Sequence, residues 1–191
     1  RPLSKYIDLG KYSMSQIGNK FEALVEIVAK LRSVDGCPWD IEQTAESLLP
    51  YFIEEVYEVI EAIDEKNWDS VKEELGDVML HLIFQALIAN EKNKFEIEDT
   101  IEFVSKKLVQ RHPHVFGDDK ADGAFHAKKN WEEAKHKEKK RKSRIDGVPR
   151  TLPSIVQAQR IQQKASYAGF DWEDSDDVWK KISEEIDELR I

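Results

Sequence analysis

Acidic side chains with regular spacing are the part of this sequence best suited to chemistry. The pattern Glu54-Glu55-x-x-Glu58 is followed, after fifteen residues, by Glu74-x-x-Asp77. Side chains three or four positions apart lie on one side of a helix, so each pattern gathers carboxylates on one helix face. Clustered carboxylates repel one another and lose hydration, and a divalent cation removes both costs. Because oxygen ligands favour Mg²⁺, Mn²⁺ or Ca²⁺ over zinc, the pattern indicates a hard-metal site.

Two helices joined by a short turn must position these carboxylates. Pro50 suits a helix first turn, which predicts a helix over 50–65. A turn at 67–69 precedes a second helix over 69–90, which is apolar nearly all round and is therefore expected to be central and buried. Because the turn is short, we expect the helices to pack antiparallel and to bring Glu55, Glu58, Glu74 and Asp77 together.

Helical periodicity dominates the rest of the chain, without an alternating pattern long enough for a sheet. We expect further helices over 20–32, from about 42, and over 97–111, 125–142, 154–166 and 176–189. The fold class predicted is all-α, an antiparallel helix bundle. The predicted organisation is a tag or linker over 1–18, in which 1–13 is the tag or upstream segment. A main domain that contains the carboxylate patterns follows over 19–142, then a linker over 143–153 and a further segment over 154–191.

A weak internal repeat indicates what the last segment is. Gly-Cys-Pro-Trp-Asp ends at Asp40, and Gly-Phe-Asp-Trp-Glu ends at Glu173. Each is followed by Glu-Glu-x-x-Glu, at 54–58 and again at 184–188. No Glu-x-x-Asp follows the second copy, so residues 154–191 are predicted to be the beginning of a second, truncated domain without a credited site.

Composition narrows the class of protein. The 191 residues carry a net charge of −9, with 40% hydrophobic and 35% charged residues, which indicates a soluble globular protein and argues against a general nucleic-acid binder. One cysteine, Cys37, excludes an internal disulfide framework and fits a reducing compartment. No apolar run is long enough for a membrane span, and no signal peptide is visible. The cytoplasm is the expected location.

Three other readings compete with the hard-metal site. A di-iron bundle needs Glu-x-x-His pairs, and here Asp77 stands where histidine would be. A non-enzymatic helical interaction module fits the amphipathic helices but predicts no carboxylates on the buried helix. The third reading is weak nucleic-acid binding through 135–144, with seven Lys or Arg in ten residues. No aromatic residues interleave in that run to stack bases.

The combined motifs resemble those of the MazG-like nucleotide pyrophosphohydrolases. The resemblance rests on both carboxylate patterns, on Gly-Cys-Pro-Trp-Asp-x-x-Gln-Thr over 36–44, and on Arg-His-Pro-His-Val-Phe over 111–116. It implies the all-α NTP pyrophosphatase fold, completed by dimerisation. It also implies Mg²⁺-dependent hydrolysis of NTP or dNTP to monophosphate and pyrophosphate, with Mn²⁺ as a possible substitute, in a nucleotide-pool cleaning role.

The resemblance also implies roles for individual residues. Glu55, Glu58, Glu74 and Asp77 match the family's magnesium ligands, and Glu54 matches a glutamate that positions or activates water. Further matches are to groups that contact the nucleotide. They are Lys107 and Arg111 for the triphosphate, Trp131 near the nucleotide, and, more weakly, Lys30 for a phosphate.

Overall fold

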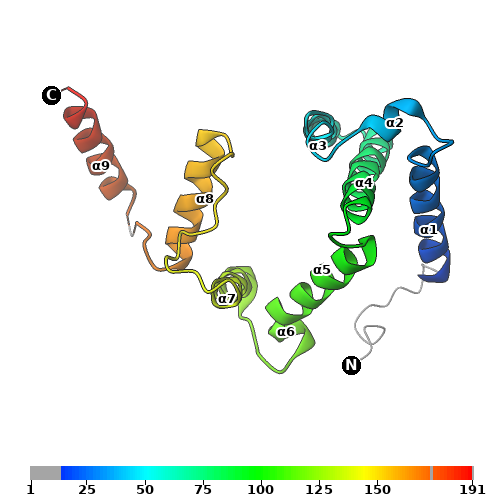
Figure 1. The fold of residues 1–191 in the computed structure, drawn as a ribbon. Helices are drawn as coiled ribbons and strands as arrows, with labels where there is room; N and C mark the ends of the chain where they lie inside the picture. Colours follow the sequence, from blue (N-terminus) through cyan, green and yellow to red (C-terminus); the bar gives the residue numbers. More distant parts are fainter. Residues whose placement is uncertain (1–13, 173, 191) are drawn as a thin grey trace. The chain divides into compact units, whose positions relative to one another are not determined.

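The computed structural model describes residues 14–172 and 174–190, and these form helices joined by turns and loops, with no strand among them (Figure 1). The predicted all-α class is confirmed. The predicted tag over 1–13 lies outside the described residues. Two compact units divide after Phe103, within the helix that spans 97–111. No helix among the described residues is long and apolar enough to cross a membrane.

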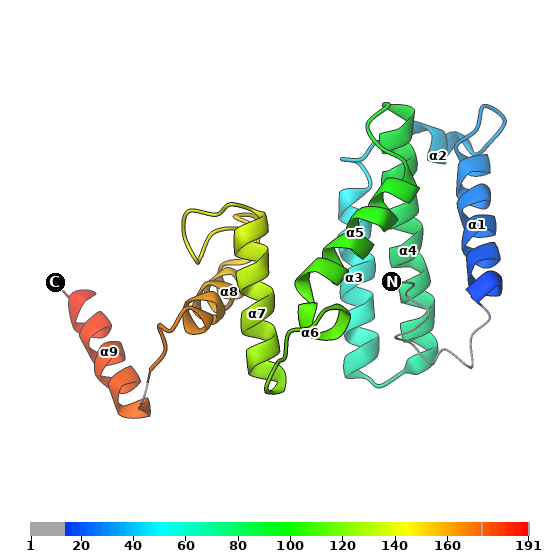
Figure 2. The ribbon, with the colours of Figure 1, turned by 90° about the horizontal axis from the view of Figure 1, so that it is seen from below.

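The first unit is built on a helical hairpin. It contains α1 (Met14–Leu31), α2 (Pro38–Glu42), α3 (Leu49–Asp64), α4 (Trp68–Glu91) and the start of α5 (Ile97–Arg111). Pro50 lies in the first turn of α3, and the Asn67 side chain caps α4 by accepting a hydrogen bond from the Ser70 amide. Figure 2 shows α3 and α4 side by side on either side of their short turn, so the antiparallel prediction is confirmed.

Helix α4 packs against α1 and α3, and its buried side is the core of the unit. The buried core residues are Val28, Leu48, Ile83, Phe84 and Ile88. The expectation that α4 is buried all round is wrong for this chain. Leu75, Met79 and Leu82 are 50%, 41% and 54% exposed. In the described residues, α1 and α3 cover only part of the circumference of α4. The apolar stripe of Leu75, Met79 and Leu82 is therefore left about half exposed.

The segment between α1 and α3 is fixed by one glycine and one arginine. A Cβ at Gly36 would collide with the carbonyl oxygens of Lys30 and Leu31, so glycine allows the chain to turn back over the end of α1. Nη1 of Arg32 donates hydrogen bonds to the carbonyl oxygens of Asp40 (2.6 Å) and Gln43 (3.3 Å). The segment ends at the fully buried Leu48, which directly precedes α3. These contacts therefore set where α3 begins.

The second unit contains the end of α5, the short α6 (Pro113–Phe116), α7 (Gly123–Glu138), α8 (Ser154–Tyr167) and α9 (Ser175–Glu188). Helix α7 ends at Glu138, before the predicted residue 142, and Lys140 adopts a positive φ of 47°, which a right-handed helix cannot continue through. Helix α1 begins six residues before the predicted start at 20, since nothing in 14–19 stops a helix although that stretch lacks apolar periodicity.

Candidate functional site

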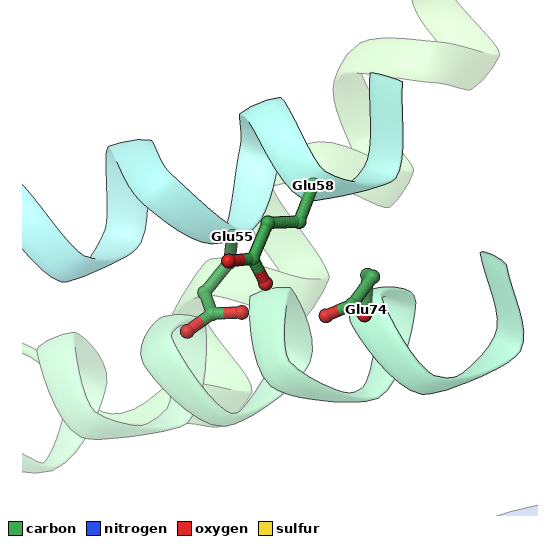
Figure 3. Close-up of side chains that lie close together, drawn as sticks. All are labelled: Glu55, Glu58 and Glu74. Carbon is green, nitrogen blue, oxygen red and sulfur yellow. The ribbon is translucent and has the colours of Figure 1, made fainter. Parts of the chain in front are cut away.

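Three glutamates converge between α3 and α4 in the first unit. Glu55 and Glu58 extend from α3, Glu74 extends from α4, and their carboxylates point toward one another (Figure 3). One oxygen from each lies within 4.8 Å of the others. Glu55 and Glu74 are half-buried and Glu58 is exposed. The i, i+3 spacing on α3 and the antiparallel packing together bring the three carboxylates to one place.

Loss of hydration and mutual repulsion make Glu55 and Glu74 harder to ionise. Burial raises the pKa of Glu55, and the charges of Glu58, Asp77, Glu74 and Glu54 raise it further. The pKa of Glu74 is also raised, first by partial loss of hydration and then by the charge of Glu58 and a hydrogen bond with it. The group therefore holds negative charge at a cost, which a cation would remove.

The other residues predicted near this group have different placements. The oxygens of Asp77 lie outside the 4.8 Å group, although its charge raises the pKa of both Glu55 and Glu74. Glu54 is exposed on α3 and lines an open groove together with Glu58. Lys30 is exposed in the last turn of α1 and is not among the groups that shift these pKa values in the described chain.

A buried histidine on α4 lies close to the carboxylate of Glu55. His81 is 7% exposed, its Nε2 lies 3.9 Å from Oε1 of Glu55, and its ring stacks on Phe52 with centroids 5.9 Å apart. Burial lowers its pKa, against the opposing charge of Asp77. A neutral imidazole is therefore expected at neutral pH, so His81 does not neutralise the carboxylates.

The donor set fits a hard divalent cation. Among the described residues, the one group of side chains close enough to hold a metal is formed by carboxylate oxygens, with no histidine or cysteine. Oxygen ligands of this kind suit Mg²⁺, Mn²⁺ or Ca²⁺. The absence of a histidine ligand from this group disfavours the di-iron reading, which needs a nitrogen ligand from each Glu-x-x-His pair.

In the second unit, Arg111 joins α5 to α7. Its Nε donates to Oε2 of Glu138 at 2.7 Å, and its guanidinium lies 5.5 Å from the centroid of the Trp131 ring. The Arg111 side chain is only 5% exposed. The Arg111 hydrogen bond lowers the pKa of Glu138, with contributions from the charges of Arg111, Lys139 and Lys107. The predicted residues Lys107, Arg111 and Trp131 thus share one electrostatic neighbourhood.

Two lysines that were not predicted from the sequence complete this basic cluster. Nζ of Lys128 and Nζ of Lys135 lie 4.4 and 4.6 Å from the centroid of the Trp131 ring. Burial lowers the pKa of Lys135, and the negative charge of Glu132 partly raises it again. Their spacing from the tryptophan, i−3 and i+4, is the signal that sequence reasoning could have used. We call Arg111, Lys128, Trp131 and Lys135 the basic cluster.

Three cations of the run over 135–144 have contacts within the second unit. Lys135 packs on Trp131, Arg141 lies against Gly147, and Arg144 lines a small cavity between α7 and α8. The other four cations of the run are exposed, and nucleic-acid binding through it stays a prediction.

Comparison with known proteins relates these features to a family. The MazG nucleotide pyrophosphohydrolase domain matches residues 43–116. The nucleoside triphosphate pyrophosphohydrolase/pyrophosphatase MazG of Thermotoga maritima is 52% identical over 93% of this chain and 69% of its own length. The nucleoside triphosphate pyrophosphohydrolase of Escherichia coli K12 is 40% identical over 90% of this chain. The matched region is 66% of the E. coli protein, so this chain spans about two thirds of these relatives.

A solved structure is similar as well. The mazG-related protein from Thermotoga maritima superposes with a TM-score of 0.51 and 32% sequence identity, covering 60% of this chain and 97% of that protein. The matched domain, residues 43–116, contains both carboxylate patterns and the predicted pair Lys107 and Arg111.

Proposed function

This chain belongs to the MazG nucleotide pyrophosphohydrolase family, and we propose that it hydrolyses nucleoside triphosphates to monophosphates and pyrophosphate, in a nucleotide-pool cleaning role. The observation that carries the proposal is the convergence of Glu55, Glu58 and Glu74 from two antiparallel helices. We expect the reaction to take place in the cytoplasm, where nucleoside triphosphates are made.

The proposed metal is Mg²⁺, with Mn²⁺ as its substitute, held by Glu55, Glu58, Glu74 and Asp77. When bound, the ion supplies positive charge that polarises phosphate oxygens. The glutamates hold it because their own repulsion favours a cation, as the raised pKa values of Glu55 and Glu74 indicate. Asp77 is proposed as a fourth ligand because its charge acts on both Glu55 and Glu74.

Glu54 is the proposed catalytic base. It lies beside Glu55 but is not part of the metal group, and it lines an open groove together with Glu58, so its carboxylate is proposed to accept a proton from water. The water oxygen then bonds to the α-phosphorus, the bond to the bridging oxygen breaks, and pyrophosphate leaves. Geometry of this kind supports a proton transfer by a carboxylate that is not itself a ligand.

The proposed nucleotide contacts are Lys107, Arg111 and Trp131, with Lys30 as a weaker candidate. The assignment rests on the family pattern and on the local chemistry of the second unit, in which cations surround one aromatic ring. Guanidinium and ammonium groups bind phosphate oxygens. Arg111 uses its Nε in the pair with Glu138, so we propose that its terminal Nη groups would contact a phosphate.

The test of this function is the release of pyrophosphate from each of the eight common NTPs and dNTPs. We expect turnover with Mg²⁺, reduced or similar turnover with Mn²⁺, and none after chelation with EDTA, because without a cation the carboxylates repel the triphosphate. Product analysis must give monophosphate and pyrophosphate in equal amounts. Release of single phosphates instead would contradict the proposed bond cleavage.

We also propose that the functional unit is a homodimer formed through uncovered apolar stripes of α3 and α4. On α3 the stripe is Val56, Ile60 and Ile63, which are 41%, 48% and 50% exposed. On α4 it is Leu75, Met79 and Leu82, with the same i, i+4, i+7 spacing. Large adjacent apolar stripes on a charged protein mark surfaces that another protein covers, and a second copy offers matching stripes.

Replacing Leu82 by lysine is expected to convert the dimer into a monomer, because a buried ammonium without a partner is costly at an interface. Light scattering coupled to gel filtration should give twice the 22.2 kDa chain mass for the parent and the single chain mass for the variant. The matched control is Val34→Lys in the loop after α1, where the side chain is 97% exposed. A monomeric parent protein would contradict the proposal.

A non-enzymatic interaction module remains the second candidate only if the carboxylates bind no metal. The proposed dimer surface is the observation that fits it. Calorimetric titration with Mg²⁺ and a non-hydrolysable NTP separates the two, since binding of both favours the enzyme and binding of neither favours the module.

A further inference from the structure

A buried ionic contact joins α7 to α8 in the second unit. Glu132 on α7 is 8% exposed, and its Oε2 accepts a hydrogen bond from Nζ of Lys164 at 3.2 Å. Lys164, on α8, is itself only 6% exposed. Nη2 of Arg160, one turn earlier on α8, lies 3.6 Å from the other oxygen of Glu132. One carboxylate of α7 is thus held between two cations of α8.

The contact is part of an ordered antiparallel packing rather than an isolated pair. Phe125, near the start of α7, meets Tyr167, at the end of α8, with ring centroids 5.6 Å apart. The connecting segment folds back on the same helices. Gly147 has a positive φ of 82° and lies against the Arg141 side chain. Nε2 of the Gln157 side chain donates to the Pro149 carbonyl oxygen at 3.4 Å.

Glu132 is also next to the basic cluster in sequence and in space. It follows Trp131, so the two side chains leave α7 about 100° apart around the helix axis. One side of α7 faces α8 through Glu132, while the adjacent side carries Lys128, Trp131 and Lys135. The charges of Glu132 and Lys164 both act on Lys135. A rotation of α7 that broke the ionic contact would therefore also move Lys128, Trp131 and Lys135 relative to Arg111 on α5.

We propose that α8 is a clamp on α7, in which Lys164 and Arg160 hold Glu132 and thereby position the basic cluster around Trp131 to receive a nucleotide. Lys164 and Arg160 are positioning residues that act through Glu132. Breaking a buried pair by removing one partner is strongly disruptive because the other charge is left uncompensated. Helix α8 lies in the segment predicted to begin a second domain, whereas α7 lies in the predicted domain over 19–142. The clamp therefore gives α8 a role in positioning residues of that domain. The part of this proposal that concerns nucleotide rests on the proposed function.

The test uses the full chain with Lys164→Met, Arg160→Met and the double substitution. Two readouts need no activity: hydrogen exchange of α7, and the indole N–H resonance of Trp131, assigned by its disappearance in Trp131→Phe. We expect exchange in α7 to rise about tenfold in the double variant and the indole resonance to move. Lys164→Arg keeps a cation opposite Glu132. We expect this variant to show the hydrogen exchange of α7 and the Trp131 resonance of the parent. The control is Lys180→Met, which removes an exposed pair with Asp177 on α9.

A kinetic readout then separates positioning from simple loss of structure. We expect KM for the NTP to rise about tenfold in Lys164→Met, with kcat within twofold of the parent. Unchanged exchange and an unmoved Trp131 resonance in the double variant would overturn the clamp, as would a moved resonance with an unchanged KM. If the double variant does not fold, Arg160→Met decides, because Arg160 is 34% exposed and its loss is milder. An inactive parent protein would refute the proposed hydrolysis, whereas exchange and the resonance would still decide the clamp.

Discussion

Glu74→Gln and Asp77→Asn are each expected to lower Mg²⁺-dependent pyrophosphate release by at least about 100-fold, because a bound cation supplies several kcal/mol of charge stabilisation and each 1.36 kcal/mol is a factor of ten in rate. Both substitutions remove a charge but keep the size and hydrogen-bonding capacity of the side chain. The helices should therefore stay folded. The measurement is steady-state release of pyrophosphate at saturating NTP, with Mg²⁺ varied from zero to saturation.

The same variants should show a thermal effect whose sign follows from the raised pKa values. Glu55 and Glu74 have pKa values above the ordinary 4.5 in the folded chain. The folded state therefore binds protons more tightly than the unfolded state, and this stabilisation is present below pH 4.5 and lost as pH rises through the folded pKa. Mg²⁺ removes the resulting repulsion, so the gain in Tm on adding Mg²⁺ should be larger at pH 7.5 than at pH 5.

Two comparisons make this result specific. Metal-free Glu74→Gln should melt no lower than the parent at pH 7.5, since one repelling charge is gone, and it should gain less from Mg²⁺. Asp69→Asn changes an exposed carboxylate at the start of α4 that acts on neither Glu55 nor Glu74, and it should keep full activity and the full gain in Tm. Full activity in both Glu74→Gln and Asp77→Asn would remove the metal site from the mechanism.

The hairpin of α3 and α4 could be predicted from the sequence because its signals are local. Pro50 and Asn67 mark helix ends by their own backbone and side-chain chemistry, and a turn of a few residues permits only antiparallel packing. The burial of α4 could not be predicted in the same way. Periodicity shows that Leu75, Met79 and Leu82 are apolar, but whether another helix covers them depends on tertiary packing, and in this chain they are half exposed.

The carboxylate group shows the same division between local and long-range information. The spacing of Glu55, Glu58 and Glu74 predicted that their side chains meet, since helix geometry fixes the direction of each Cβ. It did not determine side-chain rotamers, and the oxygens of Asp77 lie outside the group. The pairing of Arg111 with Glu138 joins residues on two helices and could not be read from spacing at all.

The largest expected effect on stability is that of Arg32→Met, which should lower the free energy of unfolding of the first unit by about 2–4 kcal/mol. The Arg32 side chain is 6% exposed. Its Nε and Nη2 lie 2.7 Å from the two oxygens of Glu91, and the same bond lowers the pKa of Glu91. Methionine keeps the bulk but leaves Glu91 and the carbonyl oxygens of Asp40 and Gln43 without this donor. The loss in free energy of unfolding is measured by urea unfolding and by hydrogen exchange in α3 and α4.

Two further variants separate the contributions to this effect. Lys72→Met removes a pair whose side chains are 77% and 97% exposed, and it should change stability by less than about 0.5 kcal/mol. Glu91→Gln removes the charge of a half-exposed partner but keeps an acceptor, and Arg32 still donates to the two carbonyl oxygens. Its cost should therefore be well below that of Arg32→Met. Equal costs for the two variants would mean that the ion pair with Glu91 alone holds the segment before α3. The hydrogen bonds from Arg32 to the carbonyl oxygens of Asp40 and Gln43 would then contribute nothing to the position of the glutamates on α3.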